Sequence, residues 1–268
     1  MRRFLMGAAM ALTISACGVS TQQEVEMGTQ YATQINQQLP IVRDPEINRY
    51  VNVLGDSIAE LTSRGQELDF QFFVVDAKEV NAFAVPGGFI YVNRGLIERA
   101  QNLSQLAGVL GHEIGHVVRR HSIKQMEKAQ GANVGATLLC VLTRVCESQA
   151  AQAAIQVGGS ALFASFSRND ENEADQEAIA NVVRAGISPQ GIPEMFRILL
   201  AERQRSPSSV EGWFATHPTE ESRVAATEAA IAQISPSILR TLTRDSQNFH
   251  AFKSRVQSLP PSPVMRRQ

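Results

Sequence analysis

The segment Gly111-His112-Glu113-Ile114-Gly115-His116 places two histidines four residues apart inside an apolar pattern. Residues four apart lie on one face of a helix, so His112 and His116 can direct two imidazole nitrogens at one metal ion. Glu113 then lies beside the open coordination position, where it can take a proton from water whose pKa the metal has lowered. The segment therefore predicts a helix that carries a catalytic zinc site.

The helix is predicted independently by an apolar stripe at three- and four-residue steps, formed by Leu103, Leu106, Leu110, Ile114 and Val117. Asn102, followed three residues later by Gln105, resembles a capping box and gives the helix a start. Gly111 and Gly115 each cost a helix about 1 kcal/mol relative to alanine. We therefore expect a substrate strand or a second helix to approach closely there, whereas a chance motif on a surface helix would leave these glycines unexplained.

A catalytic zinc has three protein ligands, so the two histidines need one more. An acidic segment downstream of the motif is the candidate source. Glu171 and Asp175 are one helical turn apart and can face the same way. We expect Glu171 to be the third ligand and Asp175 to accept a hydrogen bond from the far nitrogen of a metal-bound histidine. Arg168 precedes Glu171 by three residues and would orient the carboxylates. Glu173 is the rival ligand, and a solvated helix surface is the alternative interpretation.

These motifs, followed by Thr216-His217-Pro218 and Arg223, resemble the zinc metallopeptidase family of the CAAX prenyl endopeptidase, HtpX, Oma-type proteases, BepA and LoiP. The resemblance spans residues 40–225. It implies an α+β, mostly helical fold, with a zincin-like metallopeptidase core and a small sheet beside the motif helix.

The resemblance also implies roles for individual residues. One Zn²⁺ per chain would be held by His112, His116 and Glu171, with Glu113 as the catalytic base and with Asp175, Arg168 and Arg223 behind the ligands. His217 would approach the metal, either stabilising the tetrahedral intermediate or occupying the water position in a latent form. By spacing alone, His217 is a lone histidine before a proline, and His121 and His250 are expected to be surface residues because neither shares the face of the motif.

Three short β-rich segments precede the motif helix, at 70–75, 82–85 and 89–92, with a Pro86-Gly87-Gly88 turn between the last two. An edge strand beside the metal can bind an extended substrate by adding it as another strand. The candidate substrate strand consists of Asn81, Ala82, Phe83 and Ala84, and an ordinary core hairpin is the alternative.

Elsewhere, apolar periodicity predicts helices over 23–38, from Pro45 to Leu61 and over 193–203. Residues 204–209 are expected to form a polar loop, in which 206–209 would gate access. The small-residue segment 129–166 is expected to form a helical hairpin over the active-site cleft.

The amino terminus predicts export. Met1-Arg2-Arg3 is basic, and the apolar stretch that follows is too short to span a membrane. Ile14-Ser15-Ala16-Cys17 resembles a bacterial lipobox, so Cys17 is the expected lipidation site, with ordinary cleavage at a nearby small residue as the alternative. Gly18 in place of aspartate favours an outer-membrane anchor facing the periplasm.

The expected organisation is a lipoprotein signal peptide (1–16), a tether (17–24), a metallopeptidase domain (25–255) and a disordered tail (256–268). With Cys17 assigned to lipid, the other two cysteines are Cys140 and Cys146. An oxidising compartment favours a disulfide between them over free thiols. A continuous helix would hold them too far apart, so the segment between them would have to form a loop. The net charge of −1 and the lack of a basic stripe argue against nucleic acid as a partner.

The expected function is a lipid-anchored periplasmic zinc metalloendopeptidase that cleaves misfolded or misassembled envelope proteins, with contact to the outer-membrane assembly machinery as a possible addition. The alternative is a periplasmic chaperone for outer-membrane proteins whose zinc site is latent. A structural lipoprotein with a vestigial site is a third interpretation, against which the complete set of catalytic residues argues.

Overall fold

The computed structural model describes residues 18–131, 165–218 and 221–263. The expected signal peptide, the expected lipidation site Cys17, the cysteine pair and most of the expected hairpin lie outside the described residues. Within them, no helix combines the length and the apolar character needed to cross a membrane. The predicted α+β, mostly helical class is confirmed.

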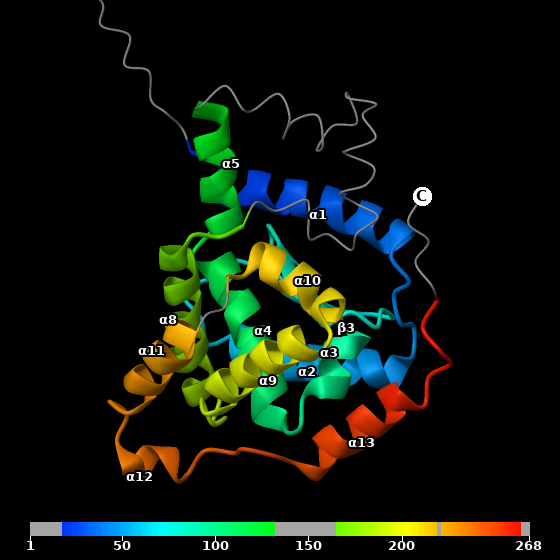
Figure 1. Ribbon diagram of the computed structural model, residues 1–268. Coiled ribbons are helices and arrows are strands. Elements are labelled where there is room, and N and C mark those ends of the chain that lie inside the picture. Colours follow the sequence, from blue (N-terminus) through cyan, green and yellow to red (C-terminus); the bar gives the residue numbers. More distant parts are fainter. Residues whose placement is uncertain (1–17, 132–164, 219–220, 264–268) are drawn as a thin grey trace, which may run out of the picture.

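The described chain folds around the motif helix α4 (Leu103–Val118), which lies at the centre of the molecule in Figure 1. The elements before it are α1 (Thr21–Gln38), α2 (Pro45–Ala59), β1 (Gln71–Val75), β2 (Ala82–Val85), β3 (Phe89–Asn93) and α3 (Arg94–Arg99). The elements after it are α5 (His121–Gly131), α8 (Arg168–Arg184), α9 (Gly191–Arg205), α10 (Pro207–Thr216), α11 (Glu221–Ile231), α12 (Pro236–Leu239) and α13 (Gln247–Gln257).

The three predicted strands form one sheet in the order β1-β3-β2. The central strand β3 pairs in parallel with β1 and antiparallel with β2, so β2 lies at one edge of the sheet. Gly87 and Gly88 adopt φ values of 85° and 98° in the turn between β2 and β3, a region that glycine reaches without a steric cost. All four residues of β2 are buried, and the strand packs against α4.

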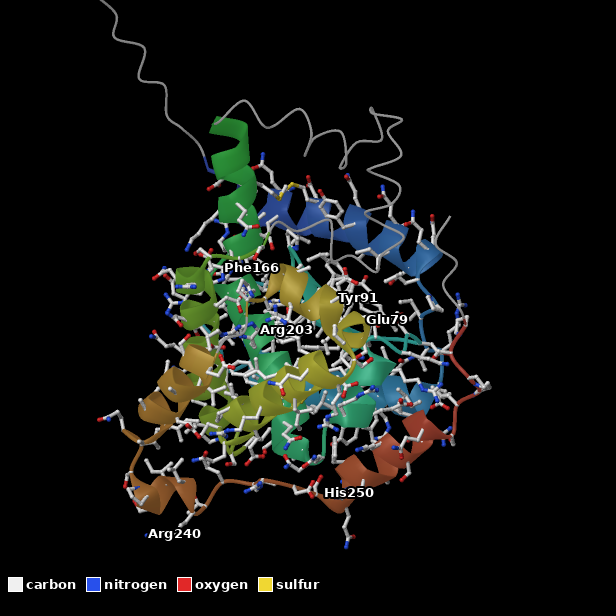
Figure 2. The ribbon with its side chains drawn as sticks, viewed as in Figure 1. Glu79, Tyr91, Phe166, Arg203, Arg240 and His250 are labelled. Atoms are coloured by element: carbon white, nitrogen blue, oxygen red, sulfur yellow. The ribbon has the colours of Figure 1, made fainter. Side chains whose placement is uncertain are left out.

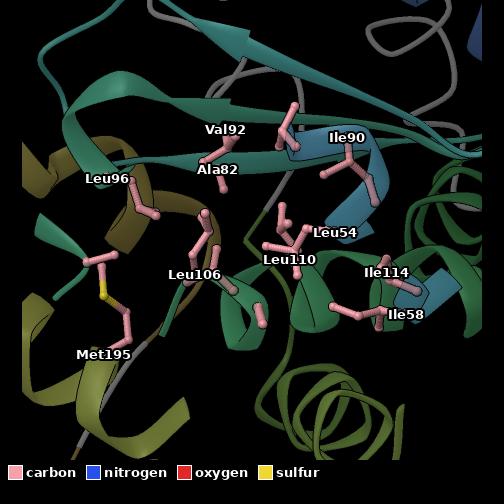
Figure 3. Packing of buried hydrophobic residues seen from close by; sticks show 14 of the residues in the cluster. Leu54, Ile58, Ala82, Ile90, Val92, Leu96, Leu106, Leu110, Ile114 and Met195 are labelled. Atoms are coloured by element: carbon pink, nitrogen blue, oxygen red, sulfur yellow. The ribbon is translucent and has the colours of Figure 1, made fainter. Parts of the chain in front are cut away.

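Every residue of α4 is buried, because layers cover it on several sides. The Asn102 side chain accepts a hydrogen bond from the backbone N–H of Gln105, as the capping pattern predicts. Figure 3 shows Leu106 and Leu110 of α4 beside the sheet residues Ala82 and Val92. α2, α8 and α9 also contact α4, so the motif helix forms the middle of the hydrophobic core.

The two glycines of the motif lie where α8 crosses α4. A Cβ atom on Gly115 would lie 2.8 Å from the carbonyl oxygen of Ala174, and one on Gly111 would lie 3.2 Å from a methyl group of Val182. The expected close approach is therefore made by a second helix, α8. Because α8 carries Glu171 and Asp175, this contact brings the acidic segment to the histidines.

The amino-terminal residues belong to the folded unit, so the prediction of a tether over 17–24 is wrong for residues 18–24. Ser20 caps α1, and the buried carboxylate of Glu24 accepts hydrogen bonds from Arg64, at 2.9 and 3.0 Å, and from Arg120, at 2.9 Å. A buried carboxylate needs such partners. The cluster joins α1 to the segment that follows α4.

Two further predictions, a disordered tail and a loop over 204–209, are wrong for the described residues. Residues 256–263 are ordered rather than a disordered tail, because α13 continues to Gln257 and the carbonyl of Pro260 accepts a hydrogen bond from Arg94 at 2.6 Å. Residues 264–268 lie outside the described residues. The expected loop over 204–209 is mostly helical: α9 runs to Arg205 and α10 begins at Pro207, leaving Ser206 between them. Proline suits the first turn of a helix, which explains the immediate restart.

The Gly115→Ala substitution is expected to destabilise the protein although it improves helix propensity. Alanine gains about 1 kcal/mol in a helix, but the added methyl group would meet the backbone of α8, and overpacking of this kind costs about 1–3 kcal/mol. Urea unfolding in the presence of a chelator measures the difference. Gly111→Ala is the control, because its methyl group would meet the movable side chain of Val182. Equal midpoints for Gly115→Ala and wild type would contradict the packing described here.

Candidate metal site

Two imidazole nitrogens converge on the buried face of α4. The Nε2 atoms of His112 and His116 lie 3.1 Å apart, and both side chains are buried. On its far side, the Nδ1 atom of His112 lies 2.9 Å from Oδ1 of Asp175, the contact expected from the sequence. A carboxylate in this position fixes the tautomer that leaves Nε2 free to bind a metal.

The first turn of α8 adds a carboxylate to this pair. Ser167 and Asp170 form a reciprocal capping box that fixes the start of the helix. Glu171 follows in that turn, fully buried, with its oxygens 3.4 Å from His116 Nε2 and 3.6 Å from His112 Nε2. Burial alone would raise the pKa of Glu171, but the nearby histidines His217, His116 and His112 hold it well below its usual value.

A third histidine comes from the end of α10. His217 caps the helix, with its backbone N–H donating to the Trp213 carbonyl at 2.8 Å. Its Nδ1 atom lies 3.2 Å from Glu171 Oε1 and 3.3 Å from His112 Nε2. The ring lies against Trp213, with 4.7 Å between ring centroids. The lone histidine before Pro218 is therefore brought to the other ligand candidates.

The four side chains fit a zinc ion. One atom from each of His112, His116, Glu171 and His217 lies within 4.8 Å of the others. Ligands at about 2.0–2.1 Å from a tetrahedral zinc are separated from one another by about 3.3–3.4 Å. The separations described above run from 3.1 to 3.6 Å, and three imidazoles with one carboxylate form a donor set that zinc accepts.

Glu113 lies beside this cluster with an unsatisfied atom. Its Oε1 is buried without a hydrogen-bond partner among the described residues, and His217 Nε2 is 3.5 Å away. Burial raises the pKa of Glu113 above its usual value. Buried polar atoms are nearly always satisfied in native proteins, so this carboxylate oxygen is available to accept a hydrogen bond from a bound molecule.

Arg223 joins the two carboxylates of α8. It donates hydrogen bonds to both oxygens of Asp175, at 2.9 and 2.7 Å, and also contacts Glu171 Oε2. Its guanidinium lies over the ring of Phe196, 4.5 Å from the ring centroid. Arg168, expected to orient these carboxylates, instead has an exposed side chain at the first residue of α8. Arg223 is the arginine that bridges Asp175 and Glu171.

The acidic residue Glu173, the rival ligand, is not among the four converging side chains. Its Oε2 lies 3.4 Å from His121 Nε2. The prediction that His121 is a surface residue is wrong: the residue is 1 % exposed, and its Nδ1 lies 2.9 Å from His116 Nδ1. Arg120 has a φ of 56°, which ends α4 and redirects the chain, so helical spacing does not apply across it. No sequence signal marks this turn, because arginine rarely adopts that conformation.

Figure 2 shows His250 directed away from the protein, as expected, and Phe166 in the interior. Phe166 stacks on His116, with 4.0 Å between ring centroids, and its backbone N–H donates to the Thr216 carbonyl at 3.0 Å. Sequence reasoning did not identify Phe166 or Trp213 as neighbours of the site. Neither residue belongs to a recognisable motif.

The candidate substrate strand lies along the motif helix. Asn81 precedes β2, is buried, and has a side-chain oxygen without a hydrogen-bond partner among the described residues. Ala82, Phe83 and Ala84 belong to β2 and are buried as well. The strand therefore lies at an edge of the sheet and against α4. Binding of substrate along it stays a prediction.

The model of the family described as "Peptidase family M48" matches residues 44–231, which is more than half of the chain. The chain belongs to this metallopeptidase family. The resemblance proposed from the sequence is therefore confirmed, and with it the enzyme class at the level of the family. All four candidate ligands and Glu113 lie within the matched residues.

Several curated proteins are similar to this M48 chain. The "Beta-barrel assembly-enhancing protease" of Escherichia coli K12 is 32% identical over 251 residues, 91% of this chain and 50% of the relative. "Metalloprotease LoiP" of the same strain is 30% identical over 64% of each chain. "Mitochondrial metalloendopeptidase OMA1" of Arabidopsis thaliana is 29% identical over 60% of this chain and 32% of the relative. The chain spans about half the length of the first of these relatives.

Removing the Arg223 guanidinium is expected to weaken zinc binding. Loss of a partner that orients ligands typically costs about 10–100-fold in metal affinity, so Arg223→Gln should raise the zinc dissociation constant by that factor. Competition with a chromophoric chelator measures it. Arg168→Gln is the matched control and should leave the affinity nearly unchanged, because that side chain is exposed. Equal affinities for the two variants would contradict the role given to Arg223.

Proposed function

We propose that this chain is a zinc-dependent metalloendopeptidase. The observation that carries the proposal is the convergence of His112, His116, Glu171 and His217, with the unsatisfied oxygen of Glu113 beside them. His112, His116 and Glu171 would hold the ion, with Asp175 and Arg223 orienting them. The membership in family M48 supports the same reaction class.

In this proposal, a bound zinc ion supplies Lewis acidity that polarises a carbonyl and lowers the pKa of water. Glu113 acts as the general base: its free oxygen accepts a proton from the water that attacks the peptide carbonyl. The same carboxyl group then donates that proton to the leaving nitrogen as the C–N bond breaks. Burial raises the pKa of Glu113, which favours its uptake of that proton.

We further propose that the described conformation is latent. His217 Nδ1 lies within the ligand set, and its Nε2 lies near Glu113, so its ring fills the space where water and a substrate carbonyl would have to lie. His112, Glu113, His116, Glu171 and His217 are each no more than 2 % exposed. Displacement of His217, and of the α10 end that carries it, would therefore precede binding.

The proposed substrates are extended segments of unfolded or misfolded proteins, because an edge strand recognises backbone rather than a particular side chain. The edge strand β2 and the unsatisfied amide oxygen of Asn81 support this proposal. Similarity to the "Beta-barrel assembly-enhancing protease" supports envelope proteins as the substrate class. We propose that the chain works in the periplasm, held at the outer membrane by lipid on Cys17, where the outer-membrane assembly machinery is a candidate partner.

A second candidate function is favoured by the closed site. A chain whose metal site is blocked by His217 could bind unfolded outer-membrane proteins as a chaperone without cutting them. Both functions use the same strand surface. They differ in whether peptide bonds break, which a cleavage assay decides.

The Glu113→Gln variant is expected to lose cleavage while keeping its metal. Full-length protein in detergent, loaded with zinc, is incubated with unfolded casein, and the new peptides are counted by mass spectrometry. Removal of a general base lowers rates by about 10²–10⁴-fold, and glutamine keeps the shape of the side chain. Metal content is measured in both samples. Bound zinc without cleavage by either protein would favour the chaperone, and absence of zinc from wild type would refute the site.

The His217→Ala variant is expected to cleave casein faster than wild type. Alanine removes the ring from the ligand cluster, and a tenfold rise would correspond to about 1.4 kcal/mol of lost stabilisation of the latent state. Initial rates at saturating zinc measure the effect. His250→Ala is the control, because that ring is exposed and its ion-pair partner is Asp245, which lies outside the cluster. A rate well below wild type would instead assign His217 to stabilisation of the tetrahedral intermediate.

A further inference from the structure

His121 is a buried histidine that the ligand set does not use. Its Nδ1 atom lies 2.9 Å from the Nδ1 atom of His116, and the two rings are close to perpendicular, with an interplanar angle of 75°. The opposite nitrogen of His121 lies 3.4 Å from Glu173 Oε2 and 3.8 Å from Asp170 Oδ1. The second histidine of the motif is therefore connected to carboxylates of α8 through another imidazole.

The direction of these hydrogen bonds follows from the donor rules of imidazole. If His116 binds a metal through Nε2, its Nδ1 must carry the hydrogen and donate it. The Nδ1 of His121 must then accept, which places the hydrogen of His121 on Nε2, facing Glu173. Each nitrogen in the chain from His116 to the carboxylate is used once.

We propose that His121 is a positioning residue for His116, holding that ring and its tautomer in the form that binds zinc. His112 achieves the same result by direct contact with Asp175. The two motif histidines thus have different supports, one a carboxylate and one an imidazole backed by a carboxylate. This inference rests on the metal site of the proposed function and names a residue outside its ligand set.

The surroundings of His121 fix its ring. Arg120, with its φ of 56°, turns the chain so that His121 returns to His116, and the guanidinium of Arg120 is bound by Glu24 at 2.9 Å. The ring of Phe166 stacks on His116 and lies 6.0 Å from the His121 ring, measured between centroids. A preorganised support of this kind is what orients a metal ligand before the metal arrives.

The tautomer of His121 tests the proposal without a substitution. Long-range ¹H–¹⁵N spectra of the zinc-loaded, full-length protein report which ring nitrogen carries the hydrogen. We expect an unprotonated Nδ1 and a protonated Nε2 on His121, with a protonated Nδ1 on His116. A hydrogen on Nδ1 of His121, or a doubly protonated ring, would overturn the proposal.

Two variants separate positioning from packing. His121→Asn retains an oxygen acceptor near the position of Nδ1, whereas His121→Leu fills the space without one. We expect the leucine variant to bind zinc about 10–100-fold more weakly, and the asparagine variant to bind nearly as tightly as wild type, with affinities measured by chelator competition. Urea midpoints of the metal-free variants report any change in packing.

The outcomes are distinguishable from failure of the proposed function. Wild type without zinc affinity would refute the metal site itself and this inference with it. Wild type that binds zinc beside a leucine variant of equal affinity would overturn the role of His121 alone. Equal weakening of both variants would assign His121 to packing and would also overturn the proposal.

Discussion

The close packing of α4 against α8 is the contact on which the site depends. Gly111 and Gly115 remove the side chains that would separate the two helices, and the backbone of α8 occupies the space. The acidic residues of α8 consequently reach the histidines of α4 inside the protein. The helix propensity that each motif glycine costs is therefore compensated by the contact with α8. This contact brings Asp175 to His112 and Glu171 to His116.

Charge in the buried cluster has to be balanced without solvent. Three carboxylates, on Glu113, Glu171 and Asp175, are gathered in a region that water does not reach. Arg223 supplies one permanent positive charge, and burial of its guanidinium is offset by Asp175 and Glu171, which raise its pKa. A divalent cation would complete the balance. The need to neutralise buried carboxylates explains why an arginine from α11, far along the chain, belongs to the same cluster.

The sequence predicts the parts of the site that obey helical periodicity. The placement of His112, His116 and Glu113 on one helix, and of Glu171 and Asp175 on another, follows from helical periodicity, and the strands follow from short β-rich runs. The role of His217, at the end of a helix, follows only from the family resemblance. Where the chain breaks regularity, prediction fails. His121 is misplaced because Arg120 adopts a left-handed conformation. The packing of residues 18–24 and 258–263 depends on tertiary partners such as Arg64 and Arg94 that no local pattern reveals.

The hydrogen bond between Phe166 and Thr216 ties the segment before α8 to the end of α10, and this link slows the opening of the site. His217 is the cap of α10, and its buried ring lies beside the rings of Trp213 and Phe166, so it cannot rotate out of the cluster unless these neighbours move. Moving that end also breaks the bond to Phe166, whose ring lies on His116. Opening is then a cooperative movement of two chain segments, which belongs to the microsecond-to-millisecond range rather than to the nanosecond range of side-chain rotations. Brief thermal fluctuations of single residues would leave such a site shut.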